Sequence, residues 1–188
     1  MEECIMKKKV MLFVAALFAV MLVSGCGDSQ SLYEVGTPNS FGDFVTASLN
    51  GSETITPAEF MDNNLTVVKF WATWCGPCVS ELPVLQRVTE EYGNRGVEVI
   101  GFMFDAVHFE DGSRDDESIN HAFSLLEVAP DFRAFVPDSL ILNYINDHVP
   151  FLPTTYVLNS NGEIVYHKVG ASNFNEWSGL LNGLLADE

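Results

Sequence analysis

Two cysteines separated by two residues, Cys75 and Cys78, are the side chains of this sequence most able to do chemistry. A C-x-x-C pair can cycle between dithiol and disulfide, or it can supply two ligands of a zinc site. A zinc site needs two further ligands. The other two cysteines lie near the start of the chain, and the four histidines are scattered singly, without ligand spacing. The pattern therefore favours a redox-active disulfide, and we expect no metal and no bound cofactor.

A strand and a helix must position these cysteines. Residues 65–71 are mostly apolar and rich in β-branched and aromatic side chains, which predicts a buried central strand. Leucine and valine then recur at helical spacing as far as Tyr92. A helix that begins at Cys75 presents unpaired N–H groups and its dipole to the sulfur, and both favour a thiolate. We therefore expect Cys75 to attack substrates and the less exposed Cys78 to be the resolving thiol.

The remaining pattern alternates strands with helices. The predicted elements are a strand over 44–49, a helix that starts at Thr56, the strand over 65–71, a helix over 75–92 with a kink or a break at Pro83, a strand over 97–104, a loop over 105–116, a helix over 117–127, a short strand over 131–136, a helix over 138–145, a hairpin over 154–169 and a last helix over 174–185. Alternation implies a parallel sheet, to which the hairpin adds an antiparallel edge. We predict an α/β fold whose mixed central β-sheet is flanked by helices.

The first 26 residues resemble the export signal of a bacterial lipoprotein. Three lysines precede an uncharged run over 10–23, which is short for a membrane-spanning helix but suits a signal peptide. The run ends in Leu-Val-Ser-Gly followed by Cys26, and this sequence is similar to the lipoprotein cleavage box. The resemblance implies a signal peptide over 1–25, a lipid on Cys26, a flexible tether over 26–40 and a domain over 41–188. An uncleaved membrane anchor is the alternative.

The charge and the cysteine count narrow the function further. A formal net charge of −17 argues against nucleic acid and against a basic surface that docks on anionic lipid. If Cys4 leaves with the signal peptide and Cys26 carries lipid, only Cys75 and Cys78 remain as thiols, too few for a structural disulfide framework. We expect an extracytoplasmic monomer, held to the bacterial cytoplasmic membrane by its lipid anchor.

Three separated motifs resemble thioredoxin-like proteins of the TlpA/ResA type. They are Trp-Ala-Thr-Trp-Cys-Gly-Pro-Cys at 71–78, Glu-Leu-Pro at 81–83 and Leu-Pro-Thr at 152–154, and the resemblance covers about residues 41–185. It implies a thioredoxin fold with an N-terminal extension and a central insertion, and thiol–disulfide oxidoreductase activity. The implied substrates are exported cysteine-containing proteins, and the implied electron donor is a membrane protein of the CcdA/DsbD type.

The resemblance also implies roles for two charged residues near the dithiol. Glu81 follows Cys78 by three positions on the same helix face, and it would accept the proton of Cys78; the alternative is a solvated glutamate at a helix start. Lys69 departs from ordinary thioredoxins, which carry a buried aspartate at this position. Its amine would favour a thiolate or pair with Glu81, or else the side chain would reach out to the edge of the sheet.

A second group of residues would bind the substrate polypeptide. Pro153 resembles the cis-proline that faces the dithiol in this fold, and it would leave the backbone of Leu152 free to pair with an extended peptide. Trp74 would shield the dithiol and offer an apolar docking surface, whereas Trp71 is expected in the core. The predicted substrate-binding residues are Trp74, Gly76, Pro77, Leu152, Pro153 and Thr154.

Reduction of disulfides in exported proteins is the function that these features favour. The Gly-Pro dipeptide between the cysteines is similar to that of reducing thioredoxins rather than strong oxidants. A thiol peroxidase of the same fold superfamily and a non-catalytic binding lipoprotein are the alternatives. The acidic segment over 105–116 does not fit a calcium-binding loop, and we expect a solvated insertion that helps to choose partners.

Overall fold

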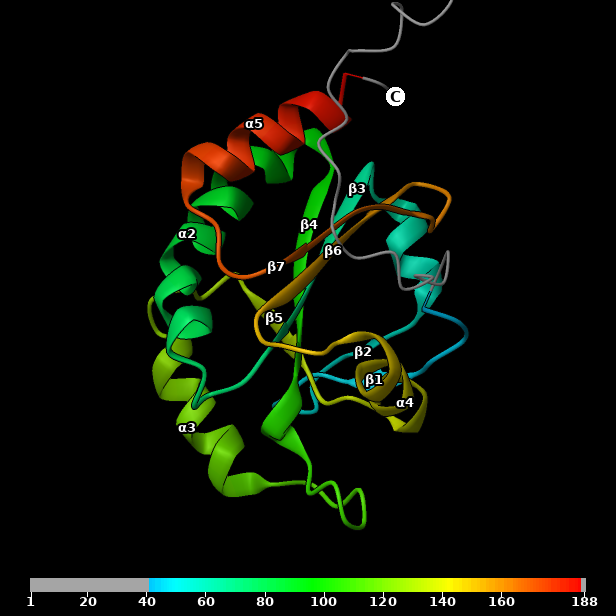
Figure 1. Cartoon of the computed structure of the whole chain (residues 1–188), viewed down its shortest axis with the longest axis vertical. Helices are drawn as coiled ribbons and strands as arrows, with labels where there is room; N and C mark the ends of the chain where they lie inside the picture. Colours follow the sequence, from blue (N-terminus) through cyan, green and yellow to red (C-terminus); the bar gives the residue numbers. More distant parts are fainter. Residues whose placement is uncertain (1–40, 187–188) are drawn as a thin grey trace, which may run out of the picture. The chain divides into compact units, whose positions relative to one another are not determined.

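A five-stranded mixed sheet forms the centre of the computed structural model, which describes residues 41–186 (Figure 1). The strands are β3 (Leu65–Trp71), β4 (Val97–Met103), β5 (Arg133–Phe135), β6 (Thr154–Asn159) and β7 (Ile164–Val169). Their order in the sheet is β5-β4-β3-β6-β7. The β3–β4 and β4–β5 pairs are parallel, and the β3–β6 and β6–β7 pairs are antiparallel. The predicted mixed sheet with an antiparallel edge is confirmed.

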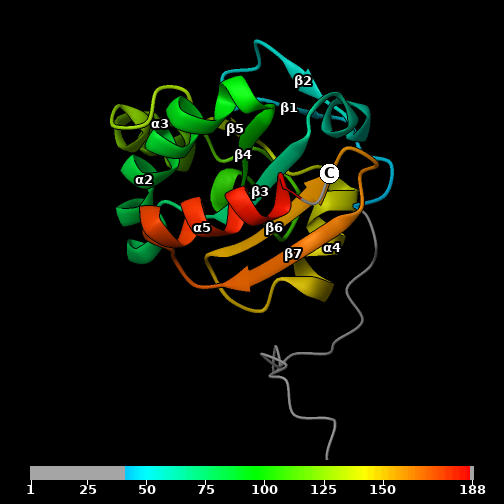
Figure 2. The same cartoon turned by 90° about the horizontal axis from the view of Figure 1, so that it is seen from above.

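Helices cover both faces of this sheet. On one side lie α2 (Gly76–Tyr92), α3 (Asp116–Leu126) and α5 (Phe174–Leu184), and on the other lies α4 (Ser139–His148) (Figures 1 and 2). Each helix buries one stripe of apolar residues, as Trp177 and Leu181 do at i, i+4 spacing in α5. The sheet thus separates two hydrophobic cores, and β3 contributes side chains to both.

Strand alternation decides which side chains of β3 lie beneath α2. Val67 and Trp71 belong to the core under α2, α3 and α5, whereas Val68 and Phe70 belong to the core under α4. Because successive side chains of a strand point to opposite faces, Lys69 shares the α2 side with Val67 and Trp71. All seven residues of β3 are buried, which explains a strand that is apolar on both faces.

The segment before β3 departs from its prediction in two places. Only β1 (Thr46–Ala47) of the strand expected over 44–49 forms, and it pairs antiparallel with β2 (Thr54–Ile55) outside the five-stranded sheet. Backbone hydrogen bonds also tie this segment to the β5 region, from the Leu49 N–H to the Ala134 carbonyl and from the Val136 N–H to the Ala47 carbonyl, both at 2.9 Å. The helix expected from Thr56 is the short 3-10 helix η2 (Pro57–Asp62), although the predicted cap is present, since the Glu59 carboxylate accepts a hydrogen bond from the Thr56 N–H at 3.2 Å.

The helix that carries the cysteines runs on through Pro83, so of the expected kink or break, the break does not occur. Proline removes one N–H donor from a helix, which leaves the carbonyl of Val79 without its usual partner. Pro83 itself is exposed, so water can reach this part of the helix. Buried side chains on either side of Pro83 keep α2 against the sheet. They are Cys78 and Leu82 before the proline and Leu85 after it.

The insertion between β4 and α3 has local structure of its own. A 3-10 turn, η4 (Phe104–Ala106), follows β4, and an isolated antiparallel bridge then joins Val107 to Arg114. The Asp115 carboxylate caps α3 by accepting the N–H groups of Glu117 and Ser118. The 3-10 helix η3 (Gly93–Arg95) links α2 to β4. Among the helices of residues 41–186, none is both long and apolar enough to cross a membrane.

Candidate active site

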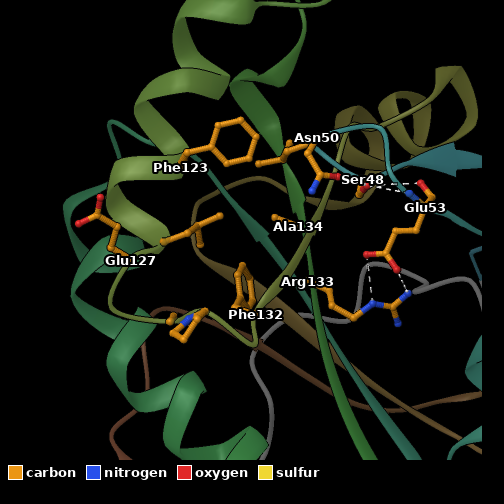
Figure 3. Close-up of a pocket in the computed structure, with 12 residues that line it drawn as sticks. Ser48, Asn50, Glu53, Phe123, Glu127, Phe132, Arg133 and Ala134 are labelled. Carbon is orange, nitrogen blue, oxygen red and sulfur yellow. Dashed lines mark hydrogen bonds and ion pairs between the residues drawn. The ribbon is translucent and has the colours of Figure 1, made fainter.

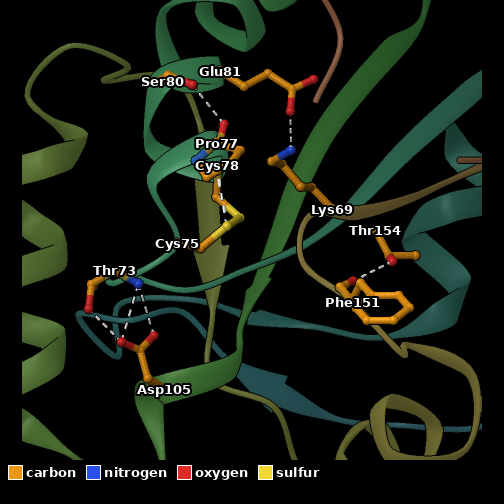
Figure 4. Close-up of a disulfide and its surroundings, with 10 residues drawn as sticks. All are labelled: Lys69, Thr73, Cys75, Pro77, Cys78, Ser80, Glu81, Asp105, Phe151 and Thr154. Atoms are coloured by element: carbon orange, nitrogen blue, oxygen red, sulfur yellow. Dashed lines mark hydrogen bonds and ion pairs between the residues drawn. A yellow bond between two sulfur atoms is a disulfide. The ribbon is translucent and has the colours of Figure 1, made fainter. Parts of the chain in front are cut away.

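Cys75 and Cys78 form a disulfide at the N-terminus of α2 (Figure 4). Their Cα atoms lie 5.2 Å apart. Cys75 is 5% exposed and Cys78 is completely buried. An attacking thiol must be reached by its substrate, so this difference assigns the outer sulfur to Cys75 and the inner one to Cys78, in the order that the sequence predicts.

The chain enters α2 with Cys75 as the N-cap residue. The Cys75 N–H donates to the carbonyl of Ala72 at 3.2 Å, which closes the turn after β3. The Cys75 sulfur accepts the N–H of Cys78 at 3.3 Å, where a serine or aspartate oxygen usually accepts at a helix start. Gly76 and Pro77 are exposed in the first turn, and Pro77 loses no bond there because early N–H groups have no helical partner. These donors and the helix dipole stabilise negative charge on Cys75 after reduction.

An aspartate in η4, just after β4, holds the loop that leads to Cys75. The Asp105 carboxylate accepts the Thr73 N–H with both oxygens at 3.2 Å, and it accepts the Thr73 hydroxyl at 2.5 Å (Figure 4). Thr73 lies only two residues before Cys75. The contact therefore ties the active-site loop to the neighbouring parallel strand, and it gives one acid of the insertion a structural role.

A buried ion pair joins β3 to α2 behind the disulfide. The ammonium of Lys69 contacts Oε2 of Glu81, and both side chains are inaccessible to solvent (Figure 4). Oε1 of Glu81 accepts two further hydrogen bonds, from the Ser172 N–H at 2.9 Å and from Nε1 of Trp177 at 3.0 Å. Burial lowers the pKa of Lys69 below its usual value, and the Glu81 carboxylate opposes this shift. The pair with its two neutral donors is the most strongly polar site inside the core.

The structure therefore contradicts two alternatives from the sequence, a Lys69 that reaches the edge of the sheet and a Glu81 that is solvated. Lys69 does not extend to the edge of the sheet, because β3 is the central strand and its neighbours cover the side chain. Glu81 is not solvated, because α5 and β3 close over its carboxylate. The hydrogen bonds of Glu81 go to Lys69, Ser172 and Trp177, and the oxidised state shows none from it to either sulfur. Proton transfer from Cys78 to Glu81 stays a prediction.

The peptide bond between Leu152 and Pro153 is cis. Pro153 and Thr154 are buried, and Leu152 is half-buried. The Thr154 hydroxyl donates to the carbonyl of Phe151 at 2.7 Å, and the carbonyl of Pro153 accepts the Gly170 N–H at 2.8 Å. Within residues 41–186 no hydrogen bond engages the backbone of Leu152. Phe151 and Thr154 lie in the surroundings of the disulfide, so this loop borders the site (Figure 4).

The two tryptophans of the motif occupy opposite environments. Trp71 is fully buried and packs edge-to-face on Phe132, with ring centroids 5.9 Å apart. Trp74 is 64% exposed, although it directly precedes Cys75. An exposed tryptophan beside a reactive sulfur has a large apolar surface available for a partner. The predicted division between a core Trp71 and an exposed Trp74 agrees with these environments.

A cavity of about 320 Å³ lies elsewhere, between α3 and the β5 edge of the sheet (Figure 3). Its wall includes Phe123, Phe132 and Arg133, and the Arg133 guanidinium pairs with Glu53 at 2.9 Å. None of the residues predicted for the dithiol site lines it. Groups of three or more potential metal ligands are absent from residues 41–186. This cavity is therefore separate from the disulfide.

Sequence reasoning missed four residues that support the site. Asp105 had a detectable signal, because it follows β4, and the carboxyl ends of parallel strands meet at one edge of a sheet. Ser172 and Trp177 had none, because they contact Glu81 from 91 and 96 residues away along the chain. Phe104 packs against Trp74, with ring centroids 6.0 Å apart, and was assigned only to a strand end. Cys26 lies outside the described residues.

Comparison with known proteins places this architecture in context. The sequence profile of the redoxin family matches residues 37–182. The thiol-disulfide oxidoreductase ResA of Oceanobacillus iheyensis is 26% identical over 180 residues, which cover 96% of this chain and 88% of that protein. Sporulation thiol-disulfide oxidoreductase A of Bacillus subtilis is 26% identical over 138 residues, which cover 72% of this chain and 77% of that protein.

Solved structures share the fold as well. A thiol:disulfide interchange protein of the thioredoxin family from Chlorobium tepidum superposes with a TM-score of 0.63 at 19% identity, covering 79% of this chain and 97% of that one. At this level of identity the likeness concerns the fold alone. It confirms the thioredoxin-type architecture that the motifs imply.

Proposed function

This chain belongs to the redoxin family and is a thiol–disulfide oxidoreductase, and we propose that it reduces disulfides of exported proteins through Cys75 and Cys78. The observation that carries the proposal is the disulfide at the N-terminus of α2, in which Cys75 is slightly exposed, at 5%, and Cys78 is completely buried. A helix N-terminus lowers the energy of a thiolate, and the thiolate is the species that attacks a disulfide.

The reaction follows from the order of the two sulfurs. The Cys75 thiolate attacks one sulfur of a substrate disulfide, forms a mixed disulfide and releases the other substrate sulfur as a thiolate. Cys78 then loses its proton and attacks the Cys75 sulfur, which releases the second substrate thiolate. Two electrons have passed to the substrate, and the Cys75–Cys78 disulfide seen in the structure is the product. A membrane dithiol donor of the CcdA/DsbD type would return the pair to its reduced state.

Glu81 is our candidate for the acceptor of the Cys78 proton. Its carboxylate lies in the core behind the disulfide, one helical turn from Cys78. Lys69, Ser172 and Trp177 all donate to this carboxylate and hold it in place in the core.

The cis-proline loop is our candidate for the substrate-binding edge. The N–H and C=O of Leu152 have no partner within the described residues, and the loop borders the disulfide (Figure 4). An extended substrate segment could pair with these two groups as one more short strand. Trp74, Gly76 and Pro77 are exposed on the side of the helix start and would contact the same segment.

The direction of electron flow can be tested by equilibrating the protein with redox buffers. We expect the Cys75–Cys78 couple to have a reduction potential like that of reducing thioredoxins, which is about −270 mV. A strong oxidant has a reduction potential of about −120 mV. The fraction of disulfide at each buffer potential is measured by mass after thiol alkylation. Oxidised insulin serves as the substrate in a parallel rate assay. A potential near −120 mV would contradict a reductase and favour a disulfide-forming enzyme.

We also propose that the protein acts outside the cytoplasm, anchored by a lipid on Cys26. The sequence around Cys26 and the charged, apolar and small residues before it support this location. The intact mass of protein extracted from membranes should correspond to residues 26–188 plus a lipid. A Cys26→Ala variant should retain residues 1–25 and lose the lipid mass. Parent protein that retains residues 1–25 would contradict the proposal.

A further inference from the structure

A row of three aromatic rings leads from the reactive disulfide into the acidic insertion. Trp74, next to Cys75, packs edge-to-face on Phe104 with ring centroids 6.0 Å apart. Phe104 in turn contacts Phe109, whose ring centroid lies 4.4 Å away. Trp74 is 64% exposed and Phe109 is 53% exposed. The row therefore forms a continuous apolar surface that begins at the attacking cysteine.

The backbone around Phe109 is closed into a compact turn. Val107 and Arg114 form an antiparallel bridge, and the His108 N–H donates to the Ser113 carbonyl at 2.8 Å. The Gly112 N–H donates to the carbonyl of His108 at 2.8 Å. The guanidinium of Arg114 contacts the carbonyl of Leu49, which ties the turn to the segment before β2. A side chain on such a turn is presented in a fixed place, so a ligand does not have to order it.

The exposure of Phe109 on an ordered turn calls for an explanation, because burying a large apolar side chain is favourable. Large apolar side chains gathered at the surface mark binding sites more often than singly scattered ones do. Phe123 on α3 is a contrasting exposed phenylalanine. It lines the separate cavity (Figure 3), and its ring forms no aromatic pair with the rings of the row.

The charges beside the row favour a basic ligand. Residues 105–116 contain five carboxylates and one arginine. Asp105 binds Thr73, Asp115 caps α3 and Asp116 pairs with Arg114 at 2.9 Å. Glu110 and Asp111, which directly follow Phe109, have no cationic partner within residues 41–186. Hydrogen bonds from Ser113 lower the pKa of Asp111, which keeps its carboxylate charged.

We propose that Trp74, Phe104 and Phe109 dock the substrate polypeptide, and that they select a cysteine segment with a large apolar side chain near its cysteine and a lysine or arginine beyond it. The apolar side chain would pack on the aromatic row, and the basic group would lie by Glu110 and Asp111. This proposal rests on the proposed reductase function, and it adds a preference for the amino-acid sequence around the substrate cysteine. The occupant is an extended or unfolded segment, because the reacting sulfur must reach the helix start at Cys75.

Binding can be measured without any redox step. The probe is a short peptide with serine in place of cysteine, flanked on both sides by phenylalanine and lysine, and its dissociation constant is obtained by NMR titration. We expect Phe109→Ser to raise this constant about five- to tenfold. The matched control Phe123→Ser should leave it unchanged. A probe with glutamate in place of lysine should bind the parent several-fold more weakly, and 1 M salt should remove that difference.

Each outcome decides the proposal. Equal dissociation constants for the parent and Phe109→Ser, or no binding to the parent, would overturn it. A change of oligomeric state in Phe109→Ser without a change in peptide binding would also overturn it, because the row would then be covered by a second copy of the chain. Reduction of cystamine, a small disulfide that cannot span the row, tests the redox chemistry of the parent separately from docking. Failure of the parent to reduce cystamine would refute the reductase function, while the serine peptide would still decide the docking surface.

Discussion

A Lys69→Met variant should unfold with a free energy about 3–5 kcal/mol below that of the parent at neutral pH. The substitution keeps most of the volume of the side chain but leaves the Glu81 carboxylate buried without its cation. Ser172 and Trp177 still donate to the carboxylate, but neutral donors replace only part of a full charge. Urea denaturation at neutral pH measures this loss of unfolding free energy.

Two further variants make this test specific. Lys69→Met combined with Glu81→Gln should recover most of the lost stability, since the amide carries no charge and its oxygen can accept from Ser172 and Trp177. Lys168→Met removes a partly exposed lysine that pairs with Glu176 at 3.2 Å, and it should cost about 1 kcal/mol or less. A Lys69→Met variant that loses no more stability than Lys168→Met would contradict a buried, mutually dependent ion pair.

The Glu81→Gln substitution on its own tests whether Glu81 accepts the proton of Cys78. Glu81→Gln cannot accept the proton of Cys78, so the resolving attack should slow and the mixed disulfide should persist longer than in the parent. Thiol titration of the reduced protein, followed by the rate of alkylation against pH, reports both cysteines. An unchanged titration together with an unchanged reduction rate would leave Glu81 with a structural role only.

Cys78→Ser should turn a catalytic enzyme into a trap. Cys75 can still attack a substrate disulfide, but no second thiol releases the substrate, so mixed disulfides should accumulate while turnover falls to background. Non-reducing electrophoresis of membranes that contain the variant should show adducts that a reductant removes. Their identification by mass spectrometry would name the natural substrates.

Cys75→Ser is the matched control for trapping. Its remaining thiol, Cys78, is completely buried in the structure, and substrate cannot reach it without local unfolding. This variant should form no adducts and should not reduce insulin. Adducts on Cys75→Ser as abundant as those on Cys78→Ser would contradict the assignment of the attacking sulfur.

Much of the site could be predicted because its residues are neighbours in sequence. Cys75, Cys78 and Glu81 lie within two turns of one helix, so their spacing alone placed them together. The partner of Lys69 was left open, because strand alternation gives the face of a side chain and not the element above it. The contacts of Trp177 with Glu81 depend on how α5 packs across α2, and no local pattern encodes that packing.

The fold shows the same division between local and long-range information. All seven residues of β3 are buried, and the strand forms over residues 65–71, where the mostly apolar sequence predicts it. The strand expected over 44–49 was too long, since Thr46 and Ala47 find ladder partners in β2, and Ser48 forms only an isolated bridge with Phe135. An alternating pattern shows that a segment is extended, but the length of a strand depends on its neighbours.

The two hydrogen bonds that Glu81 accepts from Ser172, just before α5, and from Trp177, within α5, have a consequence for the order in which the site is completed. Ser172 and Trp177 are synthesised 91 and 96 residues after Glu81. Until that last segment has emerged and docked, the Glu81 carboxylate lacks two of its three donors and has no reason to leave water. The active centre is therefore completed last, although its cysteines lie in the first half of the chain. A polypeptide still being synthesised would have a C-x-x-C motif but not the finished redox centre.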